Sequence, residues 1–403
     1  MTAPALRSTL RSDVRRAKRP SAAAPLARRN LVADPWRLAR SVAGIAFAVL
    51  LMMLEIGFRD GYIESMLLMM RQLDGDIMLV NTSMYQFERA QPFPRRLLAV
   101  ALGAPGVASA RPFYVERTRG IWKNPQNEQH FVVSVFAFDP DQPVLKLPEI
   151  ADHLAALRQP YTIMFDRHAR TDLGSADAGT RTELAGRAVR VIGTFWLGPN
   201  FFNDGNIVMG DHTYFTLFGG AGDKHDRPDP EVGVVKLRDG YDRSAALSAL
   251  RALMPPGVAV LTKQEMLDQE AELHARYSPV GPIFNVGVIV GFFVGMLISY
   301  QILFSEISDQ LPQYATLKAI GYTTPYLVKV VLQQAVFYAL VGYIPAWCLA
   351  ALMFRIIAAI AVGPMQVTVS LTLTTLALTL VMCVVSALIA VRRVVAADPA
   401  EVF

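Results

Sequence analysis

The sequence contains almost no cysteine, and little of its charge falls in its apolar segments. Of 403 residues, 53% are hydrophobic and 18% are charged, and only two are cysteines. Both of these, Cys348 and Cys383, lie inside long apolar runs. The chain therefore has no disulfide framework for a domain outside the cell, and the two thiols are most simply small apolar side chains.

The motifs of nucleotide-binding and hydrolytic enzymes are also missing. The sequence has no G-x-x-x-x-G-K-[ST], no H-E-x-x-H and no G-x-S-x-G. All six histidines fall between residues 130 and 274, without the spacing of metal ligands. Asp166 and His168 are close in sequence, but such a pair is more simply a surface contact. We therefore expect no catalytic residue, no cofactor and no metal in this chain.

Four apolar runs are each long enough to cross a bilayer, which takes about 20 residues of helix. The first stands alone near the N-terminus, and the other three come close together after a long insertion. This 1+3 arrangement predicts a membrane α-helical protein with one large domain between its first and second spans. The predicted spans are residues 41–58, 280–304, 326–354 and 367–391.

The charge near the N-terminus predicts the orientation of the chain in the membrane. Residues 1–40 contain ten Lys or Arg and two Asp or Glu, and basic flanks stay in the cytoplasm. Four spans then place both termini in the cytoplasm and the insertion on the outer side of the membrane. A cleaved signal peptide is disfavoured, because Glu55 and Arg59 stand where small residues would be needed. Nucleic-acid binding is disfavoured because the tail has no recognised module.

The segments that flank the first two spans have their own patterns. Residues 1–25 have the composition of a disordered tail. Residues 26–40 are basic and amphipathic, which favours a helix on the inner membrane surface over an ordinary positive flank. Helical spacing continues through residues 59–75 and recurs in residues 263–279. These two segments predict a pair of stalk helices.

The insertion, residues 76–262, predicts an α+β domain. Residues 76–81 and 187–196 have strand patterns. A strand, a helix and a strand over residues 232–261 predict a βαβ-like unit. We expect loops at 165–186 and 219–230, and a short periplasmic loop at 355–366.

Small residues recur on the first two spans. Gly287, Gly291 and Gly295 are spaced four apart, and Gly44 and Ala48 form a matching stripe. Such stripes let helices approach closely, so we expect tight packing here, within the chain or in a homodimer. Gln333 and Gln334 of the third span can form hydrogen bonds between helices.

The cytoplasmic loop, residues 305–325, predicts a short helix with an ordered start and stop. Pro312 suits a first helical turn and Gly321 a C-terminal cap. Tyr314, Leu317 and Ile320 are spaced to share one face. Such a helix is well placed to dock onto another protein, whereas the alternative is a simple connector. After this loop, residues 392–403 form a short cytoplasmic tail.

Three stretches resemble one family. They are residues 26–60, with the runs LARRNL, RLARSVAGIAFAVLL and EIGFRD; residues 314–322, with YATLKAIGY; and the ending, with RRV and DPA. Together with the layout, they are similar to the MacB/FtsX-like permeases of ATP-driven transporters, most closely to the DevC-type permeases.

This resemblance implies a homodimer in lipid, bound to a separate cytoplasmic ABC ATPase that holds ATP and Mg. It also implies a periplasmic adaptor and an outer-membrane exit duct. The implied function is the export of a lipid, glycolipid, peptide or drug-like cargo by mechanotransmission. The alternatives are a membrane-anchored periplasmic sensor or scaffold, and an FtsX-like regulator of a periplasmic enzyme. The implied ATPase contacts are Tyr314, Leu317, Lys318, Ala319, Ile320 and Gly321.

Overall fold

The computed structural model describes residues 35–83, 91–198, 200–219, 227–361 and 365–396. The chain divides into two compact parts, which are described separately. Of the described residues, the first part holds residues 35–49, 292–345 and 376–396, and the second holds residues 50–291 and 346–375.

Four helices of the described chain are long and apolar enough to cross a membrane. They are α2 (Pro35–Gln72), α9 (Val280–Asp309), α11 (Thr324–Ala361) and α12 (Val369–Ala396). With the inserted domain between α2 and α9, they confirm the predicted 1+3 architecture. No Gly or Pro interrupts residues 355–361, so α11 continues into the segment predicted as a periplasmic loop.

The first helix is a single element. We predicted that the helix of the 41–58 span continues into the 59–75 stalk, and α2 runs through both segments without a break to Gln72. The predicted interfacial helix over 26–40 differs, because α2 begins at Pro35 and has no break near residue 40. Residues 1–25, and 26–34 of the predicted interfacial helix, lie outside the described residues. At 1.5 Å per residue α2 is roughly 57 Å long, nearly twice the roughly 30 Å thickness of a bilayer core.

The glycines of α9 face α2. In the second part of the molecule, a Cβ added to Gly291 would lie 2.7 Å from the Leu51 side chain, and one added to Gly287 would lie 2.4 Å from the carboxyl group of Glu55. In the first part, a Cβ on Gly295 would lie 2.4 Å from the sulfur of Met382 in α12 and 2.8 Å from the Cβ of Ala48.

The small residues of α2 likewise pack against α9. A Cβ on Gly44 would lie 3.0 Å from the Ile298 side chain. The α9 stripe is thus covered by α2 of the same chain, and a homodimer would have to use another surface. Several large apolar side chains of α9 remain exposed: Ile283, Val286, Ile289, Val290, Phe293, Val294 and Leu297.

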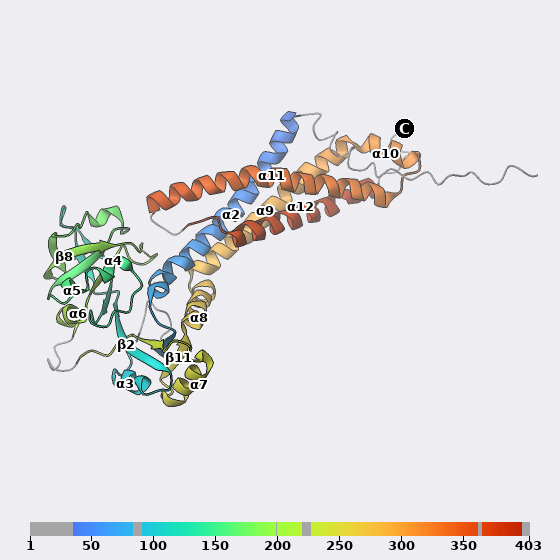
Figure 1. Ribbon diagram of the computed structural model, residues 1–403. Coiled ribbons are helices and arrows are strands. Elements are labelled where there is room, and N and C mark those ends of the chain that lie inside the picture. Colours follow the sequence, from blue (N-terminus) through green and yellow to red (C-terminus); the bar gives the residue numbers. More distant parts are fainter. Residues whose placement is uncertain (1–34, 84–90, 199, 220–226, 362–364, 397–403) are drawn as a thin grey trace, which may run out of the picture. The chain divides into compact units, whose positions relative to one another are not determined.

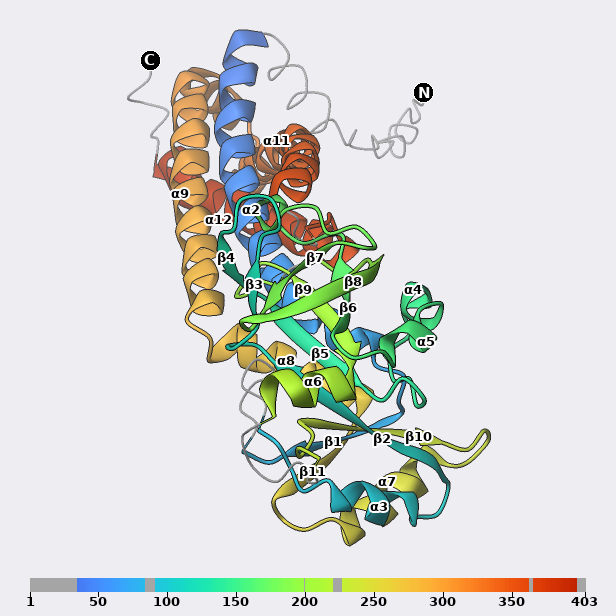
Figure 2. The same ribbon diagram turned by 90° about the vertical axis from the view of Figure 1, so that its left-hand side faces the viewer.

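The inserted domain, residues 76–262, contains one sheet with the strand order β11-β1-β10-β2-β5-β9-β6-β8-β7-β3-β4 in the described residues. Figures 1 and 2 show the sheet and the helices around it. The strands are β1 (Ile77–Asn81), β2 (Val107–Glu116), β3 (Ile121–Lys123), β4 (His130–Val132), β5 (Ser134–Phe138), β6 (Thr162–Asp166), β7 (Arg181–Leu184), β8 (Arg187–Phe195), β9 (Asn206–Gly210), β10 (Val232–Leu237) and β11 (Val258–Thr262). The helices are α3 (Arg96–Leu102), α4 (Pro148–Ala151), α5 (Leu154–Leu157), the 3-10 helix η2 (Thr171–Leu173), α6 (Asp211–Phe218), α7 (Arg243–Leu253) and α8 (Lys263–Arg276).

The long strand β2 joins the two halves of this sheet. Its first residues pair with β10 as far as Phe113, and its last residues, from Tyr114, pair with β5. One strand therefore belongs to both halves, which makes the inserted domain a single unit.

Strand alternation builds a core on each face of the first half of the sheet. In β1, Ile77 and Leu79 join the core under α3 and α7 (Figure 2), whereas Met78 and Val80 join the core that includes the end of α2 and the start of α8. In the second half, α6 covers a third core. β1 is therefore buried on both faces, and its pairing with β10 and β11 places it between two strands.

This position of β1 changes the unit predicted for residues 232–261. The strands β10 and β11 both pair with β1, and each is antiparallel to it, so β1 splits the expected βαβ unit. A second difference lies in residues 165–186, where β7 forms instead of a loop. Its residues Arg181 and Glu183 are polar and exposed. The segment therefore lacks the run of apolar residues by which a strand is predicted. Residues 220–226 of the other predicted loop lie outside the described residues.

The glycine contacts predict the effect of a larger side chain. We expect Gly295→Leu to destabilise the full-length chain in detergent by about 1–3 kcal/mol, because overpacking displaces closely packed helices. The matched control is Val294→Leu, since Val294 is exposed on the same helix. Equal thermal unfolding midpoints for the two variants would contradict the packing described here.

Candidate functional site

The predicted cytoplasmic helix is present as α10 (Leu311–Ala319), between α9 and α11 of the first part (Figure 1). Pro312 lies in its first turn. Gly321 has φ of +102°, and the amides of Gly321 and Tyr322 donate to the carbonyls of Lys318 and Leu317. This pair of bonds is a Schellman cap, which needs a residue in the left-handed region. The sequence therefore defines both ends of α10.

The residues predicted on one face of α10 are divided between its two sides. Tyr314 is buried, Leu317 and Lys318 are half-buried, and Ile320 is 70% exposed just after the last turn. The prediction that Tyr314, Leu317 and Ile320 share one face is thus corrected, because Tyr314 points into the protein. Ala319 is the last residue of the helix.

Tyr314 belongs to a buried polar group that we call the α10 anchor: Glu306, Gln310, Tyr314, Gln334 and Tyr338. The hydroxyl of Tyr338 donates to Glu306 at 2.6 Å. The hydroxyl of Tyr314 lies 3.2 Å from Oε1 of Gln310 and 3.5 Å from Oε1 of Gln334. These contacts connect α9, α10 and α11.

Burial makes the α10 anchor a strong constraint. A buried polar group without a hydrogen bond costs free energy, so α10 is held where these bonds can form. Burial, with the nearby Glu306 carboxylate, raises the pKa of Tyr314 to about 12. Its hydroxyl therefore keeps its proton at neutral pH and remains a donor. We conclude that α10 is fixed to its neighbours through Tyr314 while Ile320 remains exposed.

Sequence reasoning identified Gln334 but missed Glu306 and Tyr338. A signal was present for Tyr338, because Gln334 and Tyr338 are four residues apart within α11. Polar residues at this spacing lie on one face of a helix.

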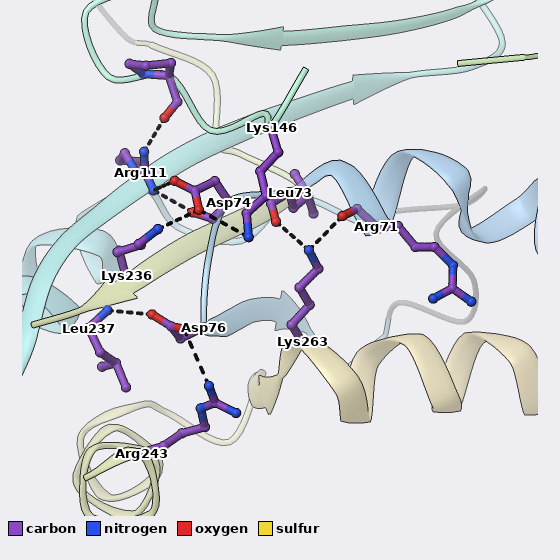
Figure 3. A network of polar contacts seen from close by, with 11 residues as sticks. Arg71, Leu73, Asp74, Asp76, Arg111, Lys146, Lys236, Leu237, Arg243 and Lys263 are labelled. Carbon is purple, nitrogen blue, oxygen red and sulfur yellow. Dashed lines mark hydrogen bonds and ion pairs between the residues drawn. The ribbon is translucent and has the colours of Figure 1, made fainter. Parts of the chain in front are cut away.

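A second polar cluster lies in the second part, where α2 enters the inserted domain (Figure 3). Lys263, the first residue of α8, donates from Nζ to the backbone carbonyls of Arg71 and Leu73, at 2.7 Å each. A cation at the C-terminus of a helix satisfies carbonyls that have no partner within the helix and complements the helix dipole. The end of α2 and the start of α8 are therefore tied together.

Asp74 is the centre of this cluster (Figure 3). Its Oδ1 lies 2.6 Å from Nζ of Lys236 and 3.6 Å from Nζ of Lys146, and its Oδ2 lies 3.9 Å from Nη2 of Arg111. Arg111 also donates to the backbone carbonyl of Asp74 at 2.6 Å. The residue that leads out of α2 is thus bound to β2, to β10 and to the chain before α4.

Two neighbours extend the cluster. Asp76 accepts a hydrogen bond from the backbone amide of Leu237 at 3.0 Å and pairs with Arg243 of α7 at 3.7 Å. We call the group of Asp74, Asp76, Arg111, Lys146, Lys236, Arg243 and Lys263 the α2 joint. It fixes the direction in which the chain enters the sheet.

The charges of the α2 joint shift the pKa of its central acid. Burial by itself would raise the pKa of Asp74, but the hydrogen bond and charge of Lys236, together with Lys146 and Arg111, hold it below its ordinary value. Asp74 is therefore ionised across the neutral range.

The helices α2 and α8 also contact each other along their length. The hydroxyl of Tyr62 lies 2.9 Å from Nδ1 of His274 and 2.8 Å from the Ser278 hydroxyl, and Nε2 of His274 lies 3.1 Å from Glu270. All four side chains are buried. The two stalk helices thus contact each other at two places, once along their length and once at the α2 joint.

Comparison with known proteins identifies the class. A family model described as MacB-like periplasmic core domain matches residues 39–253, and one described as FtsX-like permease C-terminal matches residues 285–399. No curated protein matches the chain.

Three solved structures are similar to part of it, each at 14% identity. The periplasmic region of MacB from Actinobacillus actinomycetemcomitans has a TM-score of 0.35, covering 50% of this chain and 94% of that one. The extracellular domain of the noncanonic ABC-type transporter YknZ from Gram-positive bacteria has a TM-score of 0.33, with 46% and 98% covered. A domain of a putative permease from Porphyromonas gingivalis has a TM-score of 0.31, with 47% and 88% covered.

The four helices, the inserted domain and the two family models define a permease of the ABC transporter type, a multi-pass protein of the inner membrane. The periplasmic core model spans more than half of the sequence, so the chain belongs to the family of MacB/FtsX-like permeases. The family implies an ABC ATPase as partner. The inserted domain is accordingly the periplasmic domain.

The α2 joint predicts a pH-dependent stability. We expect Asp74→Asn to lower the stability of the full chain at pH 7 by about 1–2 kcal/mol, since it weakens charge-assisted hydrogen bonds. The folded-state pKa of Asp74 is depressed, so its contribution is full above its unfolded pKa of about 3.9 and is lost as the pH falls through the folded pKa. The difference between wild type and variant should therefore shrink below about pH 4.

Thermal unfolding of both proteins from pH 7 to pH 3 would measure this difference. The control is Asp239→Asn, because Asp239 is exposed in the turn after β10. A constant difference across this range, or an equal effect of the control, would contradict the assignment.

Proposed function

We propose that this permease transmits motion from a separate cytoplasmic ATPase to its periplasmic domain, and so exports a cargo. The observation that carries the proposal is the helix α10, which contacts the α10 anchor through Tyr314 and is followed by the exposed Ile320. A short helix fixed in this way can transmit a displacement, because α10 cannot move without moving α9 and α11.

The order of the elements supports a route for this motion. The helix α10 follows α9 directly, and α9 follows α8. The first residue of α8 holds the end of α2 at the α2 joint. A displacement of α10 would therefore reach the periplasmic domain through α9 and α8, and would bear on the residues around Asp74.

The proposed assembly follows the family. Both termini face the cytoplasm, where α10 would contact an ABC ATPase that binds ATP and Mg through Leu317, Lys318, Ala319, Ile320 and Gly321. Tyr314 would position this surface and would not touch the ATPase, because its side chain is buried.

On the other side of the membrane, a periplasmic adaptor and an outer-membrane exit duct would complete a tripartite exporter of the DevC type. Its cargo would be a lipid, a glycolipid, a peptide or a drug-like molecule. Two copies of this chain would form the permease, and the exposed apolar side chains of α9 offer a surface for lipid or for the second copy.

The docking surface makes a direct prediction. We expect Leu317→Asp combined with Ile320→Asp to reduce co-purification of the ATPase at least about tenfold, because a buried, unpaired carboxylate opposes binding. The amount of membrane-inserted permease should be unchanged. Pull-down of the ATPase encoded with this permease, followed by an ATP hydrolysis assay, would measure the effect.

The control places a carboxylate on the other side of the membrane. Leu253→Asp alters an exposed leucine of α7 in the periplasmic domain, and ATPase binding should be retained. Undiminished binding by the double variant would refute docking at α10.

A further inference from the structure

Three large aromatic side chains are exposed on the connection between β8 and β9. Trp196 is 47% exposed, Phe201 is 55% exposed and Phe202 is 54% exposed. We call this group the aromatic loop. The rings of Phe201 and Phe202 contact each other, with centroids 6.0 Å apart, and large apolar side chains exposed together indicate a site of contact.

A buried carboxylate shapes the start of the aromatic loop. Asp166, at the end of β6, is fully buried and accepts hydrogen bonds from the amides of Leu197 and Gly198 at 3.1 and 2.8 Å. Asn206 of β9 donates both to this carboxylate and to the carbonyl of Gly198, at 2.8 and 2.7 Å. The backbone that follows Trp196 is thus fixed to two strands of the sheet.

Other polar contacts fix the second half of the loop. The side chain of Asn200 accepts from the amides of Phe202 and Asn203 at 2.9 and 2.8 Å. Asn203 is buried and donates to the hydroxyl of Ser134 at 2.7 Å. Hydrogen bonds therefore hold the backbone next to Trp196, at residues 197–198, and next to Phe201, at residues 202–203.

The aromatic loop lies beside the stalk helices. The ring of Phe201 packs edge-on against Tyr62 of α2, with centroids 5.2 Å apart. Tyr62 in turn contacts Ser278, between α8 and α9. The neighbouring Tyr277 is 71% exposed, and the exposed apolar face of α9 begins at Ile283.

This place in the chain corresponds to the edge of the bilayer. Arg59, hydrogen-bonded to Asn285 at 3.0 Å, is the first basic residue of α2 after its apolar run. Tyr62 is about 4.5 Å further along the helix, at 1.5 Å per residue. The headgroup layer on each side of a bilayer is roughly 5–8 Å deep. Tyr62, and with it Phe201, therefore falls at the depth of the lipid headgroups.

We propose that the aromatic loop inserts into the headgroup layer of the periplasmic leaflet and holds the periplasmic domain against the membrane. Aromatic side chains are enriched at this depth. Arg167, whose guanidinium lies 5.9 Å from the Trp196 ring, supplies a cation that can pair with lipid phosphate. The occupant of this surface is thus phospholipid. The inference rests on the membrane spans and does not depend on coupling to an ATPase.

A spin label tests the position of the loop. We would replace Cys348 and Cys383 by alanine, introduce Phe202→Cys and attach a nitroxide to the full-length protein in phospholipid nanodiscs. Collisions with oxygen, which concentrates in lipid, would be compared with collisions with a water-soluble nickel chelate. Leu253→Cys on α7 is the matched control, since Leu253 is 48% exposed.

Contact with lipid predicts that the ratio of oxygen collisions to chelate collisions is several-fold higher at position 202 than at position 253. Trp196→Cys provides a second site in the same loop and should agree with position 202. A water-like ratio at both loop positions would overturn the proposal. Protection from both reagents would also overturn it, because it would show that a protein surface covers the loop.

Discussion

The ammonium group of Lys263 on the last carbonyls of α2 is the contact on which the attachment of the periplasmic domain depends. A helix end has carbonyls that no residue of that helix can satisfy. Here the first residue of the returning helix satisfies them, so the outgoing and returning helices meet at one point. Neither helix can slide along the other without breaking this contact. Any relative movement of α2 and α8 must then act on Asp74 and the strands that hold it.

Buried polar contacts fix the positions of apolar helices elsewhere in the chain. Apolar side chains pack in many registers, whereas a buried hydroxyl or carboxylate accepts few partners. In the second part, Tyr62 fixes α2 to α8 through His274 and Ser278. In the first part, Tyr338 and Tyr314 fix α11 and α10 around Glu306 and its neighbours. Such contacts favour discrete arrangements over continuous deformation, which the proposed transmission of movement requires.

Local sequence patterns were sufficient to predict the helices but not to predict the strand order of the sheet. Helical spacing and breakers predicted the extent of α2 and the cap at Gly321, because these depend on neighbouring residues. The sequence could not show that β1 separates β10 from β11, since that pairing joins residues more than 150 positions apart. Nor could it place Tyr314, because one of its polar partners, Gln334, lies on another helix, 20 residues along the chain. The aromatic loop was missed for the same reason, as Asp166 shapes a segment 30 residues away.

The two surfaces proposed for contact share one construction. Ile320 is exposed in front of the α10 anchor, and the aromatic loop is exposed in front of the buried Asp166 and Asn206. Binding costs free energy whenever the contacting groups must first be ordered. The polar groups beneath each surface order it before a partner binds, so that binding costs less free energy. An exposed apolar side chain on a backbone fixed in this way is therefore a stronger sign of an interface than exposure alone.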